Sequence, residues 1–233
     1  MRSLYIPAFL IFSFTGTKAQ HRWVIQFNID KILNARPVTV VAAGQLSNWT
    51  KGIDGNGLAD GYLTRSAALF NGDNDAHALP DNPLFADDKS HPEIKLHYSN
   101  TRSNRNQACA ISGAGKVEFN VPKGKYSSIF LAFTSAEGAS AIRVKLVYEQ
   151  DATTTDFMVP DYYQDLKPDD PNFCYLAHNL AKWGNKNNMT EKDHHNIDLL
   201  KIMPNPAWKL KSIRISKTSP GYLVFWAAAG VKY

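Results

Sequence analysis

Long hydrophobic runs and cysteines are both scarce in this sequence of 233 residues. Beyond residue 19, no stretch is long and apolar enough to cross a bilayer as a helix, so we expect no membrane-spanning segment there. The two cysteines, Cys109 and Cys174, permit at most one disulfide within the chain. In an oxidising compartment the two thiols could pair, or they could stay apart as separate buried side chains.

Basic runs and familiar catalytic motifs are also missing. Lysine and arginine number 26 against 21 acidic residues, but they form no stripe of the kind that nucleic-acid-binding proteins carry, so no nucleic-acid partner is expected. Neither the G-x-S-x-G turn of serine hydrolases nor the H-E-x-x-H pair of zinc ligands occurs. The adjacent His194 and His195 point to opposite faces if they lie on a strand, so they cannot easily share a metal ion.

The first 19 residues have the features of a signal peptide. Arg2 supplies a positive charge, residues 4–14 are apolar, and Thr17-Lys18-Ala19 places small residues before an expected cleavage at Gln20. Loss of Arg2 and Lys18 would lower the formal net charge from +5 to +3. No cysteine lies directly after the apolar segment, where a lipoprotein would carry one, so a lipid anchor is not expected. We predict an exported protein that is secreted, periplasmic or attached to the cell surface.

What the sequence does contain is a series of short strand patterns. Ile213 and Ile215 alternate with polar residues, a turn follows at 218–221, and residues 222–226 form an apolar run. Alternation is typical of a strand with one wet face, and an unbroken apolar run is typical of a buried strand. Similar patterns recur along the chain, at 94–98, 116–121, 129–133 and 141–148.

These patterns predict an all-β fold, a two-layer antiparallel β-sandwich, with residues 20–233 forming a single domain. No long amphipathic helix is present to build an α/β sheet. Leu176, Leu180 and Trp183 recur at helical spacing, which predicts one short helix over 175–183.

The C-terminal part resembles a known class of β-sandwich. Asn196-Ile197-Asp198 enters an apolar strand, and the Ile-x-Ile strand and the Leu-Val-Phe-Trp strand follow it. This order is similar to the final third of galactose-binding-like jelly rolls, which include carbohydrate-binding modules and discoidin-type domains. The resemblance covers at most residues 94–233. It implies a sugar ligand held at the loop ends, and it implies a contact from Asn196.

Independently of that resemblance, several aromatic side chains lie in polar loops where no core requires them. Saccharide C–H faces stack on aromatic rings, while sugar hydroxyls need carboxylate, amide or arginine partners. The expected ligand contacts are the rings Trp49, Tyr162, Tyr163 and Trp183 and the hydrogen-bonding side chains Asp161, His194, Asn196 and Arg102. Each ring could instead pack against the rim of the sandwich and satisfy its polar tip there.

A glycine-rich loop adds a candidate metal site. Asp54, Asn56 and Asp60 place oxygen ligands at spacings that calcium can use. The EF-hand pattern is absent, because its twelfth position from Asp54 is Arg65 rather than glutamate. The alternative is a set of turns that need glycine.

The sequence therefore predicts a secreted, non-catalytic protein that binds a polysaccharide or glycan through loop aromatics, with calcium as an optional cofactor. One alternative is a jelly-roll polysaccharide lyase or glycoside hydrolase acting on an acidic polysaccharide. In a lyase, Tyr162 and His195 would act with Arg105 as the residue that neutralises the substrate carboxylate. Another alternative is a surface or matrix adhesion protein that holds other proteins. Oligomeric state is left open.

Overall fold

The computed structural model describes residues 23–101 and 104–232. The predicted signal peptide and Arg102 lie outside these described residues. The fold is all-β with one very short α-helix, α1 (Arg65–Phe70), as the strand patterns predicted. Two single-turn 3-10 helices, η1 (Asp30–Ile32) and η2 (Gly55–Gly57), lie in the connections. Within the described ranges, no helix is long and apolar enough to pass through a membrane.

A nine-stranded sheet forms the centre of the molecule, in the order β1-β15-β9-β13-β12-β4-β2-β3, with β7 pairing to β15 off this path. Neighbouring strands are antiparallel except β2 and β4, which are parallel. Its strands are β1 (Trp23–Gln26), β2 (Val38–Ala42), β3 (Gln45–Ser47), β4 (Asp60–Leu63), β7 (Cys109–Ser112), β9 (Tyr126–Ala136), β12 (Phe173–Gly184), β13 (Met189–Ile202) and β15 (Tyr222–Lys232).

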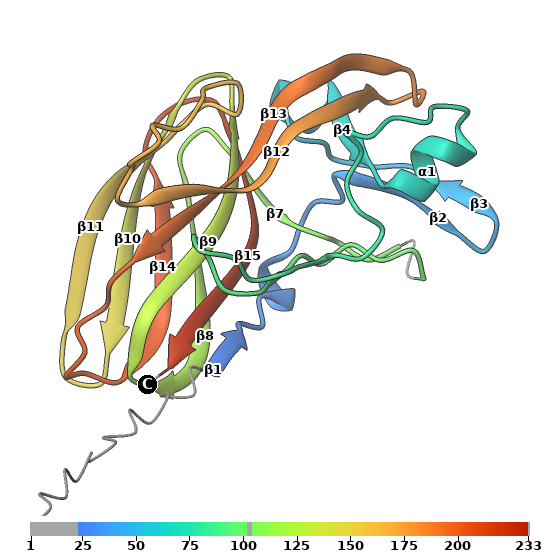
Figure 1. Cartoon of the computed structure of the whole chain (residues 1–233). Helices are drawn as coiled ribbons and strands as arrows, with labels where there is room; N and C mark the ends of the chain where they lie inside the picture. Colours follow the sequence, from blue (N-terminus) through green and yellow to red (C-terminus); the bar gives the residue numbers. More distant parts are fainter. Residues whose placement is uncertain (1–22, 102–103, 233) are drawn as a thin grey trace, which may run out of the picture.

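A four-stranded antiparallel sheet packs against one face of the large sheet, in the order β11-β10-β14-β8 (Figure 1). It consists of β8 (Gly115–Gly124), β10 (Ser140–Tyr148), β11 (Ala152–Val159) and β14 (Leu210–Lys217). The small pair β5 (Leu84–Phe85) and β6 (Ile94–Lys95) lies on the opposite face of the large sheet. The β12–β13 hairpin leaves the sandwich and reaches toward β4 and α1 (Figure 1).

Apolar residues therefore fill two core layers, one on each face of the large sheet. Leu223 and Phe225 of β15 face the core shared with the four-stranded sheet, while Val224 and Trp226 face the core beneath β6. This burial on both faces explains the unbroken apolar run at 222–226. In β14, by contrast, Ile213 and Ile215 are buried, and the intervening Arg214 pairs with Glu118.

The helix predicted over 175–183 is wrong, because this segment is part of β12. The ladder between β12 and β13 contains repeated register shifts, and Asn179 has a φ of 56°. Leu176 and Leu180 are four residues apart and lie in one core, as an even separation along a strand allows, whereas Trp183 lies in a different core. A spacing of four residues places two side chains on one face of either a helix or a strand, so this spacing did not identify a helix.

The two cysteines are free thiols in this structure, so the open question of a disulfide is answered here by separation. Cys109 belongs to the core shared with the four-stranded sheet, whereas Cys174 packs against the core on the other face. The large sheet lies between them.

Candidate functional site

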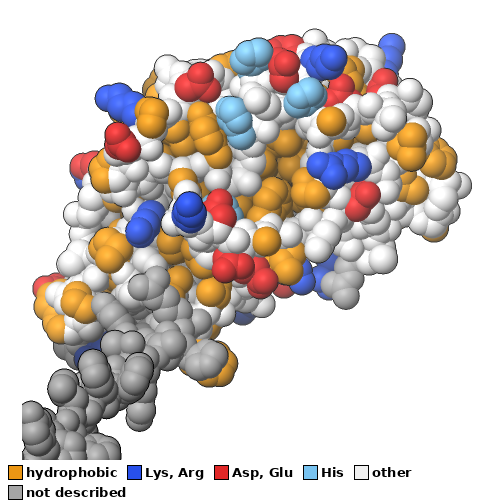
Figure 2. All heavy atoms as spheres, in the orientation of Figure 1, with side chains coloured by type: hydrophobic (Ala, Val, Ile, Leu, Met, Phe, Trp, Pro, Cys, Tyr) orange, Lys and Arg blue, Asp and Glu red, His pale blue; other side chains and the backbone are white. Residues whose placement is uncertain are grey.

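The β12–β13 hairpin, the loop before β4 and the loop after β11 together build a cluster of charged and aromatic side chains. We call it the ring–ion cluster. Its members are Asp54, Asp60, Tyr162, Tyr163, Lys182, Glu191 and His195. Figure 2 shows that histidine side chains also gather with acidic and basic ones over this part of the molecule.

Lys182 is the centre of the cluster. Its Nζ lies 2.9 Å from an oxygen of Asp54, 3.2 Å from Asp60 and 2.8 Å from Glu191. It also donates a hydrogen bond of 3.2 Å to the hydroxyl of Tyr162. The lysine side chain is only 6% exposed, so the three carboxylates replace the water that an ammonium group would otherwise need.

The loop that supplies the two aspartates is tightly closed. Asp54 accepts a hydrogen bond of 2.9 Å from the backbone N–H of Asp60, and its other oxygen accepts from Tyr162. Gly52 allows this closure, because a Cβ atom at that position would lie 1.8 Å from the carbonyl oxygen of Asp60. The glycines of this segment thus serve the turns that aim both carboxylates at Lys182.

The two tyrosines stack on one another above this ion group. Their ring centroids are 4.6 Å apart at an angle of 28°, and His195 lies against both rings. Tyr162 is buried, but Tyr163 is 45% exposed. The hydroxyl of Tyr163 hydrogen-bonds to Glu191, which also pairs with Lys182. An exposed ring is therefore held rigidly by a buried stack and a hydrogen bond.

His195 is fully buried, and its hydrogen bonds assign its tautomer. Nδ1 lies 2.7 Å from the carbonyl oxygen of Leu180 and must donate to it. In the neutral ring Nε2 therefore carries the lone pair. Nε2 lies 3.3 Å from Glu191 without forming a hydrogen bond to any described residue. Burial lowers the pKa of His195, so this neutral form prevails at pH 7.

The electrostatics of the cluster oppose general base catalysis by either tyrosine. Burial, and then the charge of Asp54, raise the pKa of Tyr162, while burial and the hydrogen bond to Glu191 raise that of Tyr163. Burial alone would lower the pKa of Lys182, but its contacts with Glu191 and Asp54 outweigh burial and raise it. Both phenols are thus protonated at pH 7 and the amine is charged. Lysine and tyrosine hold their ordinary forms, with no activated nucleophile among them.

Of the residues predicted to contact a ligand, only some share this site. Tyr162 and Tyr163 belong to the ring–ion cluster, and Asp161 supports it by accepting hydrogen bonds from the backbone N–H groups of Tyr163 and Gly138. His194 is exposed beside the cluster, with a φ of 76° and an ion pair with Asp193.

The other predicted rings have structural surroundings. Trp183 is fully buried in a small core under α1, where its Nε1 donates to Asp73. Trp49 is buried against Gly61 of β4. Asn196 is also buried, and its side-chain oxygen accepts from the backbone N–H of Asn179 at 3.3 Å. These three side chains are each at most 7% exposed, and their contacts are with the protein itself.

The three oxygen ligands predicted for calcium do not converge. Asp54 and Asp60 face the ammonium of Lys182, whereas Asn56 bonds through its side chain to Ser112 and through its backbone N–H to Glu137. Across the described ranges, no group of three or more histidine, cysteine, aspartate or glutamate side chains is placed to hold a metal ion. The lysine occupies the position between the aspartates that a cation would take.

Sequence reasoning missed Lys182 and Glu191. Neither lies in a local motif, and Lys182 meets Asp54 across a separation of 128 residues. Such a pairing follows only from the sheet topology, which places the β12–β13 hairpin beside β4.

No protein-family model matches the chain, and no curated protein matches it. The likeness to galactose-binding-like sandwiches therefore depends on the short sequence motifs alone.

Proposed function

We propose that the protein binds carbohydrate at the exposed ring of Tyr163. The observation that carries this proposal is that a large exposed aromatic side chain is immobilised by a stack on Tyr162 and a hydrogen bond to Glu191. A ring that packing has already ordered loses little conformational entropy when a sugar stacks on it. Rigid aromatic surfaces of this kind suit the C–H faces of a pyranose.

One polar group for sugar hydroxyls lies next to this ring, because the side chain of Glu191 is 41% exposed and can accept from a hydroxyl. His194, which precedes the ring-contacting His195 in the chain, has a side chain that is 74% exposed. Asp161 anchors the backbone of Tyr163 and keeps the loop in place. The site thus combines one stacking surface with a few hydrogen-bonding groups, which is the usual composition of a site for a polar ligand.

Binding without chemistry is the form of this function that the cluster favours. A lyase that uses tyrosine as its base needs a phenol that loses its proton readily, whereas the surroundings here raise the pKa of both tyrosines. The lysine is similarly held in its charged form. We therefore propose a non-catalytic glycan-binding protein, exported through its N-terminal leader.

Replacement of Tyr163 by alanine tests the proposal directly. Wild-type protein should be retained by at least one polysaccharide on a glycan array or in affinity electrophoresis. Tyr163→Ala should weaken that retention by about fivefold or more, since a stacked ring contributes ~1 kcal/mol or more. Phe70→Ala is the matched control, because it removes an exposed ring on α1 outside the cluster. Equal retention of the two variants, or no retention of wild type by any glycan, would reject the proposal.

A further inference from the structure

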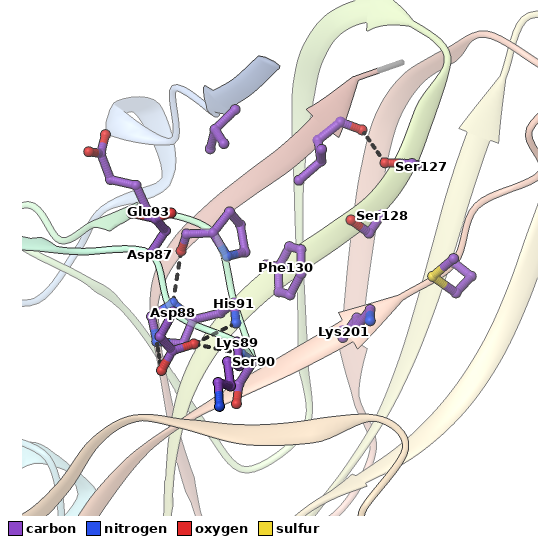
Figure 3. A pocket seen from close by; sticks show the side chains of 14 residues that line it. Asp87, Asp88, Lys89, Ser90, His91, Glu93, Ser127, Ser128, Phe130 and Lys201 are labelled. Atoms are coloured by element: carbon purple, nitrogen blue, oxygen red, sulfur yellow. Dashed lines mark hydrogen bonds and ion pairs between the residues drawn. The ribbon is translucent and has the colours of Figure 1, made fainter. Parts of the chain in front are cut away.

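A separate cavity of about 550 Å³ lies on the face of the large sheet that carries β6, well outside the ring–ion cluster. Its floor is formed by side chains of β9, β13 and β15, and the segment 87–93 covers it from one side (Figure 3). Ser128, Phe130 and Lys201 stand on the floor, and Ser90 and His91 face them from the covering segment (Figure 3). The volume is within the range of pockets that hold small ligands.

Lys201 gives the floor of this cavity a positive charge, and Asp87, Asp88, Glu93 and a second lysine, Lys89, also line the cavity. The backbone N–H of Lys201 donates to the carbonyl oxygen of Asn172, and its exposed side chain lines the cavity. Among the described residues, no carboxylate lies within ion-pair distance of its Nζ. An ammonium group that lines a recess without an ion-pair partner favours an anionic group of a ligand.

The remaining walls offer both hydroxyl and apolar surface. Ser128 is nearly buried, and its hydroxyl has no hydrogen-bond partner among the described residues. Phe130 and Val231 line the floor beside it, where each exposes a small part of its side chain (3% and 6%). A ligand that fits these walls needs an acidic group, hydroxyl groups and a C–H face in one small molecule.

The acidic residues of the covering segment do not cancel the charge of Lys201. Asp88 is already engaged, because one of its oxygens accepts from the backbone N–H groups of Ser90 at 2.6 Å and His91 at 2.9 Å. The Glu93 side chain turns away from the floor in Figure 3. The carboxylates and Lys89 thus lie on the covering segment and its rim, and Lys201 lies on the floor.

We propose that this cavity binds one uronic-acid unit, free or at the end of a glycan, with the sugar carboxylate on Lys201. A hydroxyl of the sugar bonds to Ser128, and its C–H face lies against Phe130 and Val231. The inference goes beyond the proposed function at Tyr163 and does not require it, because the two sites share no residue.

Titration with free galacturonate, followed by amide chemical shifts, tests this site, and galactose serves as the neutral ligand with the same ring. For a ligand of about thirteen non-hydrogen atoms at ordinary efficiency, we expect a dissociation constant of about 1 mM for galacturonate. Galactose should bind at least tenfold more weakly, because it lacks the group that pairs with the ammonium.

Two variants locate the binding. Lys201→Met should lower galacturonate affinity about tenfold or more, while Lys116→Met, which removes an exposed lysine of the four-stranded sheet, should leave it unchanged. Tyr163→Ala should also leave it unchanged. Galacturonate binding that survives Lys201→Met, or that is lost with Tyr163→Ala, would assign the ligand elsewhere and overturn the inference. Absence of galacturonate binding to wild type would overturn it as well, whatever polysaccharides bind at Tyr163.

Discussion

Lys182 shows how one side chain can organise a site from distant parts of the chain. Its ammonium group balances Asp54, Asp60 and Glu191 in surroundings from which water is largely excluded. Buried charges of this kind contribute little net stability when paired, but removing one partner leaves the others desolvated and uncompensated. The lysine is therefore required by the carboxylates that surround it.

We expect Lys182→Met to destabilise the protein by about 3–5 kcal/mol, because Asp54 and Asp60 would remain buried without a cation. Urea denaturation followed by tryptophan fluorescence measures this loss. Lys192→Met removes an exposed lysine of the same hairpin and should change the free energy of unfolding by less than ~0.5 kcal/mol. Similar stabilities of the two variants would mean that the buried ion group is not needed by the fold.

At the scale of elements, β12 and the loop before β4 determine where the site lies. The register shifts of β12 let Lys182 face the loop while Leu176 and Leu180 face the core. The loop, in turn, closes only because Gly52 lies directly against the backbone of Asp60. The irregular strand β12 and the glycine-dependent loop before β4 thus together bring the two aspartates to the ammonium group of Lys182.

Gly52→Ala should therefore open this loop and destabilise the protein by about 2–3 kcal/mol, because the new Cβ would collide with the Asp60 carbonyl. Gly113→Ala is the control: its φ is 60°, but no atom lies within 4 Å of the added Cβ, so only the backbone strain of ~1 kcal/mol remains. Thermal unfolding of both variants gives the comparison. A smaller loss for Gly52→Ala than for Gly113→Ala would show that the loop adapts to the added methyl group.

For the whole molecule, burial on both faces of the large sheet has a consequence for stability against pH. Asp198 of β13 is fully buried, and neither of its carboxylate oxygens has a hydrogen-bond partner among the described residues. Burial, and then the charge of Asp161, raise the pKa of Asp198 to about 8. The folded protein therefore holds this proton in a range where the unfolded chain, with an ordinary aspartate, has released it.

The direction of this pH dependence follows from the number of protons that the folded and unfolded states bind at Asp198. Between pH 4 and about 8 the folded state binds more protons at Asp198 than the unfolded state does, so this group makes the protein less stable as pH rises. Asp198→Asn removes the titration. We expect it to stabilise the protein at pH 8 relative to wild type by at least ~1 kcal/mol more than it does at pH 5.

Denaturant unfolding of wild type and Asp198→Asn at the two pH values makes the measurement. The comparison cancels the contribution of His195, whose lowered pKa has the opposite effect and costs stability below its ordinary range. A difference between the variants that does not change with pH would show that Asp198 is not protonated in the folded protein.

The sequence by itself determined the class of fold. Ile213 and Ile215 predicted a strand with one buried face, and the run at 222–226 predicted a strand buried on both, because side-chain burial in a sheet follows local alternation. It also identified Tyr162 and Tyr163 as ring candidates from their acidic surroundings in the loop after β11.

Only the tertiary structure decided which rings are exposed and which charges meet. Trp49 and Trp183 lie in polar segments but are buried, because Trp49 packs against β4 and Trp183 packs under α1, whereas Tyr163 is left at the surface. The meeting of Lys182 with Asp54 depends on strands that are neighbours in the sheet and distant in the chain. The residue pattern within a segment indicates how that segment is buried. Contacts between distant segments depend on the sheet topology, which the pattern of any one segment does not contain.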